Sequence, residues 1–208
     1  MKNCFIFGAV TVNSLPVKPG PGDYIMAADK GLLNVERLGL TADIVIGDFD
    51  SLGFIPKDKN TEVLPVRKDD TDIGYCLKKA ISKGYKNVFI YGGLGGKVDH
   101  TFANIQLSAF ASQCGARAIF IDDNCCICSV TDGTLKFENA VGRISVFCIG
   151  DKAEGVTLSG LSYPLTGATL DGFFPLGVSN EFLGGAAALT VRHGTLTVMW
   201  EGGTLPES

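Results

Sequence analysis

Acidic side chains stand close together at three places in the first half of the chain. Asp48 and Asp50 lie one residue apart, directly after the apolar run 44–46 and Gly47. In extended backbone, positions i and i+2 point the same way, so both carboxylates can reach one cation. The plain alternative is an Asx-turn with two solvated aspartates.

A second acidic cluster spans residues 68–72 and places three carboxylates within four residues. Thr71 is a natural N-cap, and Asp72 falls in the first turn of the predicted helix, where the helix dipole stabilises negative charge. Three carboxylates exceed what one cap needs. Their mutual repulsion favours a bound Mg²⁺, with Lys68 as a neighbouring cation.

A glycine-rich segment, residues 92–97, follows an apolar run and precedes a helical pattern that begins near Asp99. Glycines at such a junction let backbone N–H groups approach a phosphate. The segment matches neither the P-loop nor the dinucleotide fingerprint, because Val98 and Asp99 follow Lys97. A tight strand-to-helix turn is the alternative interpretation.

The elements that would position these residues alternate between strand and helix. Apolar runs predict strands at 4–10, 24–28, 43–47, 62–66, 87–91 and 117–122, and apolar residues at helical spacing predict helices at 30–38, 71–84 and 99–114. Strands without alternation, separated by helices, are typical of a parallel sheet covered on both faces. The prediction is an α/β N-terminal domain with a mostly parallel, Rossmann-like sheet.

The pattern changes after about residue 124, where short alternating runs replace helical periods. The clearest hairpin joins 187–192 to 195–201, and Trp200 alternates with Leu196 and Val198, which indicates packing in a core. We therefore predict a C-terminal all-β sandwich, with domains at residues 1–128 and 129–208.

Composition narrows the class of protein. The formal charge of −4 and the absence of any basic run longer than two residues argue against nucleic-acid binding. No apolar run approaches the roughly 20 residues that span a bilayer. Seven cysteines, mostly within apolar runs, suit reduced thiols. We expect a cytoplasmic protein with no membrane partner.

Taken together, these segments resemble thiamine pyrophosphokinase, also called thiamine diphosphokinase. The matching motifs occur in the family's order and cover nearly the whole chain: Ala28-Asp29 with the helix start 31–34, Gly47-Asp-Phe-Asp-Ser51, Lys68-Asp-x-Thr-Asp72, Gly93-x-Gly-Gly-Lys-x-Asp-His100 with Asn104, and Gly177-Val-Ser-Asn180. Lys30 departs from the pattern, since the family usually has glycine there.

The resemblance implies an enzyme that transfers pyrophosphate from ATP to thiamine with Mg²⁺ and works as a homodimer with active sites between subunits. Thiamine's hydroxyl would attack the β-phosphorus and expel AMP. The implied roles are as follows: Asp48, Asp50 and Asp72 bind Mg²⁺; Asp72 and Asp99 are catalytic, with Asp99 as a further Mg²⁺ ligand or as the acceptor of the hydroxyl proton; Lys68, Gly95, Gly96, Lys97 and Asp29 bind ATP; Ser179 and Asn180 lie near thiamine.

Three other functions are alternatives to this one. The run Ile44-Val-Ile-Gly-Asp48-Phe-Asp50-Ser51 also resembles haloacid-dehalogenase phosphatases, in which Asp48 would be the nucleophile. That motif normally sits on the first strand, and such a phosphatase leaves the C-terminal β domain unexplained. A non-catalytic thiamine or nucleotide sensor would be expected to lose carboxylates, and a nicotinamide oxidoreductase has only the glycine loop in its favour.

Overall fold

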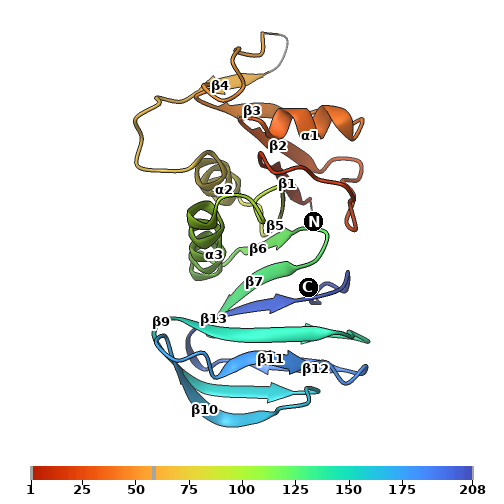
Figure 1. Cartoon of the computed structure of the whole chain (residues 1–208), viewed down its shortest axis with the longest axis vertical. Helices are drawn as coiled ribbons and strands as arrows, with labels where there is room; N and C mark the ends of the chain where they lie inside the picture. Colours follow the sequence, from red (N-terminus) through yellow and green to blue (C-terminus); the bar gives the residue numbers. More distant parts are fainter. Residues whose placement is uncertain (1, 58–59, 208) are drawn as a thin grey trace. The chain divides into compact units, whose positions relative to one another are not determined.

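A computed structural model describes residues 2–57 and 60–207. The chain divides into two compact units, residues 1–107 with 118–123 and residues 108–117 with 124–208. The elements are labelled in Figure 1. The domain boundary predicted at residues 128–129 stays a prediction.

The first unit contains a sheet with strand order β4-β3-β2-β1-β5-β6. Its elements are β1 (Cys4–Phe7), β2 (Tyr24–Ala28), α1 (Gly31–Arg37), β3 (Ile44–Gly47), β4 (Thr61–Val63), α2 (Asp72–Ser82), β5 (Asn87–Tyr91), β6 (Arg117–Ile121) and α3 (Val98–Gln113), whose last residues belong to the second unit. The strands β1, β2, β3, β4 and β5 pair in parallel. Their carboxyl ends therefore lie at one edge of the sheet, where the glycines and aspartates follow.

The core of this sheet is fully apolar. All residues of β1 and β3 are buried, as are all residues of β2 and β5 except the first of each strand. Phe5 stacks on Phe89 with ring centroids 5.1 Å apart. Continuous burial of this kind explains why these segments lack the alternation of a half-exposed strand.

The second unit is antiparallel. Its strands are β7 (Cys126–Thr131), β8 (Thr134–Phe137), β9 (Arg143–Ser159), β10 (Leu165–Asp171), β11 (Gly177–Glu181), β12 (Ala187–Thr190) and β13 (His193–Trp200). The long strand β9 pairs with β10, β11, β12 and β13. Trp200 is 1% exposed and meets the Phe137 ring edge-on at 5.2 Å, which confirms its predicted place in the core.

The predicted fold class is wrong. A Rossmann-like domain covers its sheet with a helix in most strand connections, whereas the described residues form thirteen strands and three helices, with both parallel and antiparallel pairs. The connection from β1 to β2 is a loop, because prolines 16, 19 and 21 interrupt it. The described part of the connection from β3 to β4 contains no helix either.

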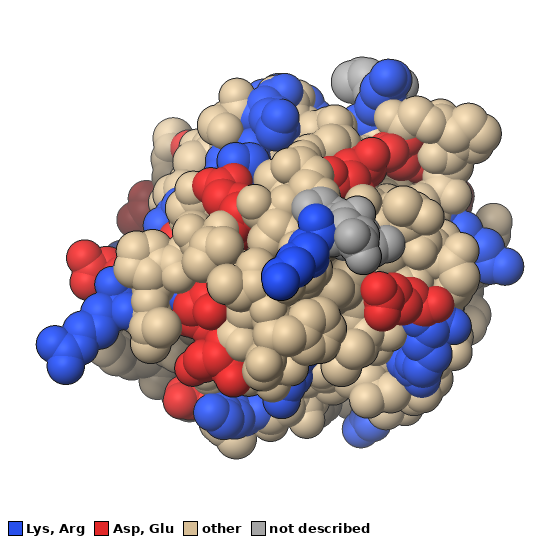
Figure 2. All heavy atoms as spheres, turned by 90° about the horizontal axis from the view of Figure 1, so that it is seen from above, with Lys and Arg blue, Asp and Glu red and all other residues tan. Residues whose placement is uncertain are grey.

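Charge is distributed without a dominant sign on the face seen in Figure 2, where Lys and Arg side chains are interspersed with Asp and Glu.

Among the described residues, α3 is the longest helix at 16 residues, and none of the helices combines the length and the apolar character that crossing a bilayer requires.

Candidate active site

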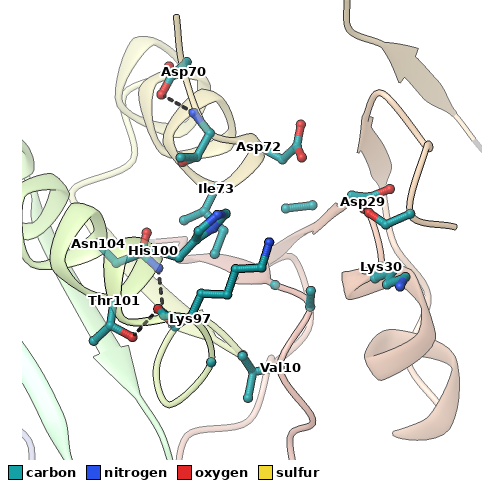
Figure 3. Close-up of a pocket in the computed structure, with 18 of the residues that line it drawn as sticks. Val10, Asp29, Lys30, Asp70, Asp72, Ile73, Lys97, His100, Thr101 and Asn104 are labelled. Atoms are coloured by element: carbon teal, nitrogen blue, oxygen red, sulfur yellow. Dashed lines mark hydrogen bonds between the residues drawn. The ribbon is translucent and has the colours of Figure 1, made fainter. Parts of the chain in front are cut away.

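The carboxyl edge of the parallel sheet contains a cleft of about 600 Å³ within the first unit. Five segments line it: residues 8–10 after β1, residues 28–30 at the end of β2, Ser51 in the turn after β3, residues from the segment 68–73 at the start of α2, and the glycine loop with the first turns of α3 (Figure 3). The parallel register brings together segments that are up to about 90 residues apart in the sequence.

Asp29 lies in the wall of this cleft and is only 7% exposed. Its backbone is left-handed, with φ of 48°, and the Ser51 hydroxyl donates a hydrogen bond to Oδ2. Its other carboxylate oxygen, Oδ1, is buried and accepts no hydrogen bond within the described part of the chain. A buried carboxylate oxygen without a donor is costly, so it indicates a place for a ligand.

Lys68 links two of the predicted carboxylates. Its Nζ lies 2.6 Å from Asp48 Oδ2 and 3.1 Å from Asp72 Oδ1. The contact with Asp72 is an ion pair whose geometry is not that of a hydrogen bond. Asp72 Oδ1 is buried, and the Lys68 ammonium is its ionic partner. The ammonium group thus stands where two carboxylates converge.

Burial and mutual contacts shift the pKa values of Asp48, Asp72 and Lys68 in different directions. The hydrogen bond from Lys68 holds the pKa of Asp48 below its ordinary value. Desolvation raises the pKa of Asp72 by more than the contact with Lys68 lowers it. Desolvation by itself lowers the pKa of Lys68, but Asp48 and Asp72 together outweigh it and leave that pKa raised.

The turn that follows β3 differs from the extended backbone assumed for it. Phe49 is buried and left-handed, with φ of 61°. The carboxylate of Asp48 accepts a 3.3 Å hydrogen bond from the Asp50 backbone N–H, as in an Asx-turn, while Asp50 itself is exposed and does not line the cleft. The extended backbone assumed between Asp48 and Asp50 is therefore wrong at this turn.

The start of α2 is the predicted one. Thr71 is extended, and its hydroxyl accepts a 3.0 Å hydrogen bond from the Gly74 N–H, which confirms Thr71 as the N-cap. Asp70 Oδ2 lies 2.8 Å from Lys78 Nζ. The helix therefore holds Asp72 in its first turn, at the cleft.

The glycine loop places Gly96 and Lys97 at the cleft, whereas Gly95 lies outside its lining. Figure 3 shows the Lys97 side chain extending toward the space between Asp72 and Asp29. Asn104 is buried, and its Nδ2 donates a 2.6 Å hydrogen bond to the Gly93 carbonyl, which fixes the loop to α3.

Asp99 is exposed and lies outside the lining of the cleft. Its Oδ1 accepts a 2.9 Å hydrogen bond from the N–H of His100. His100 and Thr101 also line the cleft, and neither is among the residues predicted above for the site. The signal was available, since Lys97, His100, Thr101 and Asn104 follow the spacing i, i+3, i+4 and i+7 of one helix face.

Lys30 also lines the cleft without having been assigned a role. Its backbone is right-handed helical, with φ of −57°, so this position needs no glycine. At the next position, a Cβ on Gly31 would lie 1.7 Å from the Phe7 carbonyl oxygen. The close approach of two backbones therefore requires glycine at 31 and not at 30.

The donor set of the cleft fits a hard divalent cation. Asp29 presents a buried oxygen without a hydrogen-bond donor, Asp72 presents one whose partner is the Lys68 ammonium, and carboxylate oxygens are the ligands that Mg²⁺ takes. In the part of the chain that the structure describes, no three acidic, histidine or cysteine side chains already converge as a preformed metal site. Lys68 instead neutralises Asp48 and Asp72.

Ser179 and Asn180 lie in the second unit, in a separate hollow of about 430 Å³ that Tyr163, Leu176 and Val178 also line. Asn180 is 3% exposed; its Oδ1 accepts from the backbone N–H groups of Tyr163 and Glu181, and its Nδ2 donates to the Tyr163 carbonyl. These hydrogen bonds occupy the Asn180 amide and fix the Tyr163 backbone in the wall of the hollow. Ser179 is exposed and left-handed, with φ of 58°.

Comparisons with known proteins point to one family. The model described as "Thiamin pyrophosphokinase, catalytic domain" matches residues 21–119, and "Thiamin pyrophosphokinase, vitamin B1 binding domain" matches residues 134–196. The chain is 25% identical to "Thiamine pyrophosphokinase" of Bacillus subtilis over 182 residues, covering 84% of this chain and 85% of the relative. It is 26% identical to "Thiamin pyrophosphokinase 1" of Caenorhabditis elegans over 149 residues, covering 66% and 61%.

Solved structures show the same fold. A thiamine pyrophosphokinase from Bacillus subtilis gives a TM-score of 0.85 at 22% identity and covers 96% of this chain and 99% of its own. Yeast thiamin pyrophosphokinase gives 0.76 at 12% identity, covering 97% and 87%. The fold is thus the one those structures share, in place of the Rossmann-like class predicted above. The two family models together span most of the sequence, and the chain belongs to the thiamin pyrophosphokinase family.

Proposed function

We propose that the cleft of the first unit is where the pyrophosphoryl group of ATP is transferred to the hydroxyl of thiamine, giving thiamine diphosphate and AMP. The activity is that of the family to which the chain belongs. The single observation that carries the assignment to this cleft is the buried carboxylate oxygen Asp29 Oδ1, which accepts no hydrogen bond among the described residues. It lies beside a glycine loop and a lysine suited to phosphates.

Mg²⁺ would be held by Asp72 together with Asp48 and Asp50, and Asp29 offers a further oxygen. When bound, the cation would neutralise charge on the β- and γ-phosphates. Asp50 is exposed in the structure, so its part in this set requires its side chain to turn. The Lys68 ammonium neutralises the negative charge of Asp48 and Asp72 through its two ion pairs.

Positive charge and backbone amides would orient the polyphosphate. Gly96 presents its backbone at the cleft, and Lys97 extends into it (Figure 3). Gly95, at the turn with φ of 74°, lets the loop double back toward the phosphates. In a transfer that is governed mainly by alignment and charge, these groups hold the β-phosphorus in line with the attacking hydroxyl.

Asp72 is the better placed of the two predicted catalytic carboxylates. It lines the cleft, whereas the Asp99 side chain caps its own helix outside the lining. We assign to Asp72 the role of accepting the proton of the thiamine hydroxyl. A general base must first of all lie within reach of the proton that it accepts. A role for Asp99 stays a prediction.

Thiamine recognition is assigned to the second unit. Residues 134–196 match the vitamin B1 binding model, and this range includes Ser179 and Asn180. Asn180 would act by shaping the Tyr163 backbone, because its amide is already hydrogen-bonded there. The homodimer, its interfacial active sites and the cytoplasmic location stay predictions from the resemblance and the composition.

The phosphatase alternative is not retained. A phosphatase of that type would leave the second unit, which matches the vitamin B1 binding model, without a role. Both family models also name the kinase.

Incubation with ATP, Mg²⁺ and thiamine tests the proposal. Formation of AMP that depends on thiamine supports it. Release of orthophosphate that is independent of thiamine would return the cleft to the phosphatase interpretation.

A further inference from the structure

The loop after β1 forms one wall of the cleft without belonging to a helix or a strand. Three of its backbone groups are bound by one buried side chain, Asn34 of α1, which is 4% exposed. The Asn34 Nδ2 donates hydrogen bonds of 2.8 Å to the carbonyls of both Gly8 and Val10, and its Oδ1 accepts a 3.1 Å hydrogen bond from the Val12 N–H. One amide therefore satisfies three backbone groups of five consecutive residues.

Arg37, one turn further along α1, supports this arrangement. Its guanidinium donates to Asn34 Oδ1 at 3.1 Å and to the Val12 carbonyl. The loop is thus fastened to the helix by a connected set of hydrogen bonds, and each member orients the next.

The same loop lies directly against the glycine loop. Gly8 N–H donates to the Tyr91 carbonyl at 2.7 Å, and Val10 N–H donates to the Gly92 carbonyl at 3.0 Å. A Cβ on Gly92 would lie 2.6 Å from the Val10 carbonyl oxygen, and a Cβ on Gly96 would lie 2.9 Å from Val10 Cγ2. Because the two loops are joined by hydrogen bonds and leave no room for a Cβ, a displacement of Val10 toward the glycine loop must displace Gly92 and Gly96.

We propose that Asn34 is a positioning residue for the nucleotide: its amide fixes the loop of residues 8–12, and this loop fixes the glycine loop that receives the phosphates. The inference rests on the proposed function, which places the phosphates of ATP at the glycine loop. Only an amide side chain of this length offers two donors to the carbonyls and one acceptor to the N–H. Asn34 acts on substrate through the loop and does not line the cleft itself.

Asn34→Asp is the sharpest variant, because it keeps the shape and replaces both donors with an oxygen that faces two carbonyls. Two measurements follow. Amide hydrogen exchange of the peptide spanning residues 8–12, in ligand-free protein, should become about tenfold faster or more. The KM for ATP should rise about tenfold or more, while the KM for thiamine changes by less than about twofold.

Arg37→Ala is the second variant, since Arg37 is exposed and its removal leaves the buried amide in place. It should shift both measurements in the same direction by about two- to fivefold. The matched control is Thr197→Val, which removes a buried 2.7 Å hydrogen bond to Ser129 in the second unit. That control should lower the melting temperature and leave the KM for ATP and the exchange of residues 8–12 unchanged.

Unchanged exchange in both α1 variants would show that Asn34 does not hold the loop. Faster exchange with an unchanged KM for ATP would show that the loop does not position the nucleotide. Either result overturns the inference. Failure of the wild-type protein to form AMP and thiamine diphosphate is a different outcome and counts against the proposed function, because the exchange experiment needs no turnover.

Discussion

Lys68 Nζ lies 2.6 Å from Asp48 Oδ2, and the same ammonium reaches Asp72, 3.1 Å away. Two carboxylates from different loops thus converge on one lysine. A divalent cation placed there would compete with the Lys68 ammonium for the oxygens of Asp48 and Asp72. Either the ammonium or the cation can therefore neutralise these two carboxylates.

Asp72→Asn should lower pyrophosphoryl transfer by about a thousandfold or more while the fold remains intact. The carboxylate is the cleft's candidate metal ligand and proton acceptor, and its removal takes away a partly desolvated charge. Turnover and the melting temperature, measured on the same preparation, check this. Turnover like that of the wild type would remove Asp72 from the mechanism.

Lys68→Met should leave Asp48 and Asp72 facing each other without their counter-ion. The variant should therefore gain more thermal stability from added Mg²⁺ than the wild type does, because ligand binding now relieves repulsion as well. Melting curves with Mg²⁺ or with EDTA provide the readout. Lys78→Met, which removes a half-exposed partner of Asp70, is the control and should respond to Mg²⁺ as the wild type does.

Glu62→Gln should lower stability in a pH-dependent way. The hydrogen bond from Lys79, followed by that from the Tyr75 hydroxyl, holds the pKa of Glu62 below its ordinary value. A carboxylate whose pKa is lowered by folding contributes stability above its unfolded pKa of about 4.5 and loses it as the pH falls through the folded value.

The free energy of unfolding should thus drop by about 1 kcal/mol in Glu62→Gln at pH 7, and the difference should disappear by about pH 3. Urea denaturation at both pH values measures it. Glu36→Gln, at an exposed position, should change neither value. A deficit in Glu62→Gln that is as large at pH 3 as at pH 7 would contradict the electrostatic explanation.

Gly31→Ala should destabilise the protein by about 2 kcal/mol or more, because its Cβ would overlap the Phe7 carbonyl oxygen and the backbone must shift. Since Asp29 precedes it by two residues, activity should fall as well. Lys30→Ala, at the neighbouring right-handed position, should leave stability within about 0.5 kcal/mol of the wild type. Equal losses in the two variants would refute the close-approach argument.

Local sequence signals predicted the elements that carry the site. Thr71 was predicted as an N-cap and is one. The three predicted helices appear as α1, α2 and α3, because their apolar spacing and terminal glycines act within a few residues. The order of the parallel strands then brings Asp29, Asp72 and Lys97 to one cleft.

Three features depended on interactions that a single sequence does not display. The left-handed backbone at Phe49 departs from the extended conformation assumed between Asp48 and Asp50, although nothing in the residue type favours it. The place of Lys30 in the lining of the cleft arises from the approach of separate loops. The Rossmann-like prediction overestimated helical cover, since periodicity identifies helices but not the face of a sheet that is left without one.

The most direct test of the central claim follows the label from ATP that carries ³²P at the β position, in the presence of Mg²⁺ and thiamine. Transfer of an intact pyrophosphoryl group predicts that the label appears in thiamine diphosphate, with one unlabelled AMP formed for each product and no ADP. Label retained in ADP, with orthophosphate released or thiamine monophosphate formed, would contradict the account.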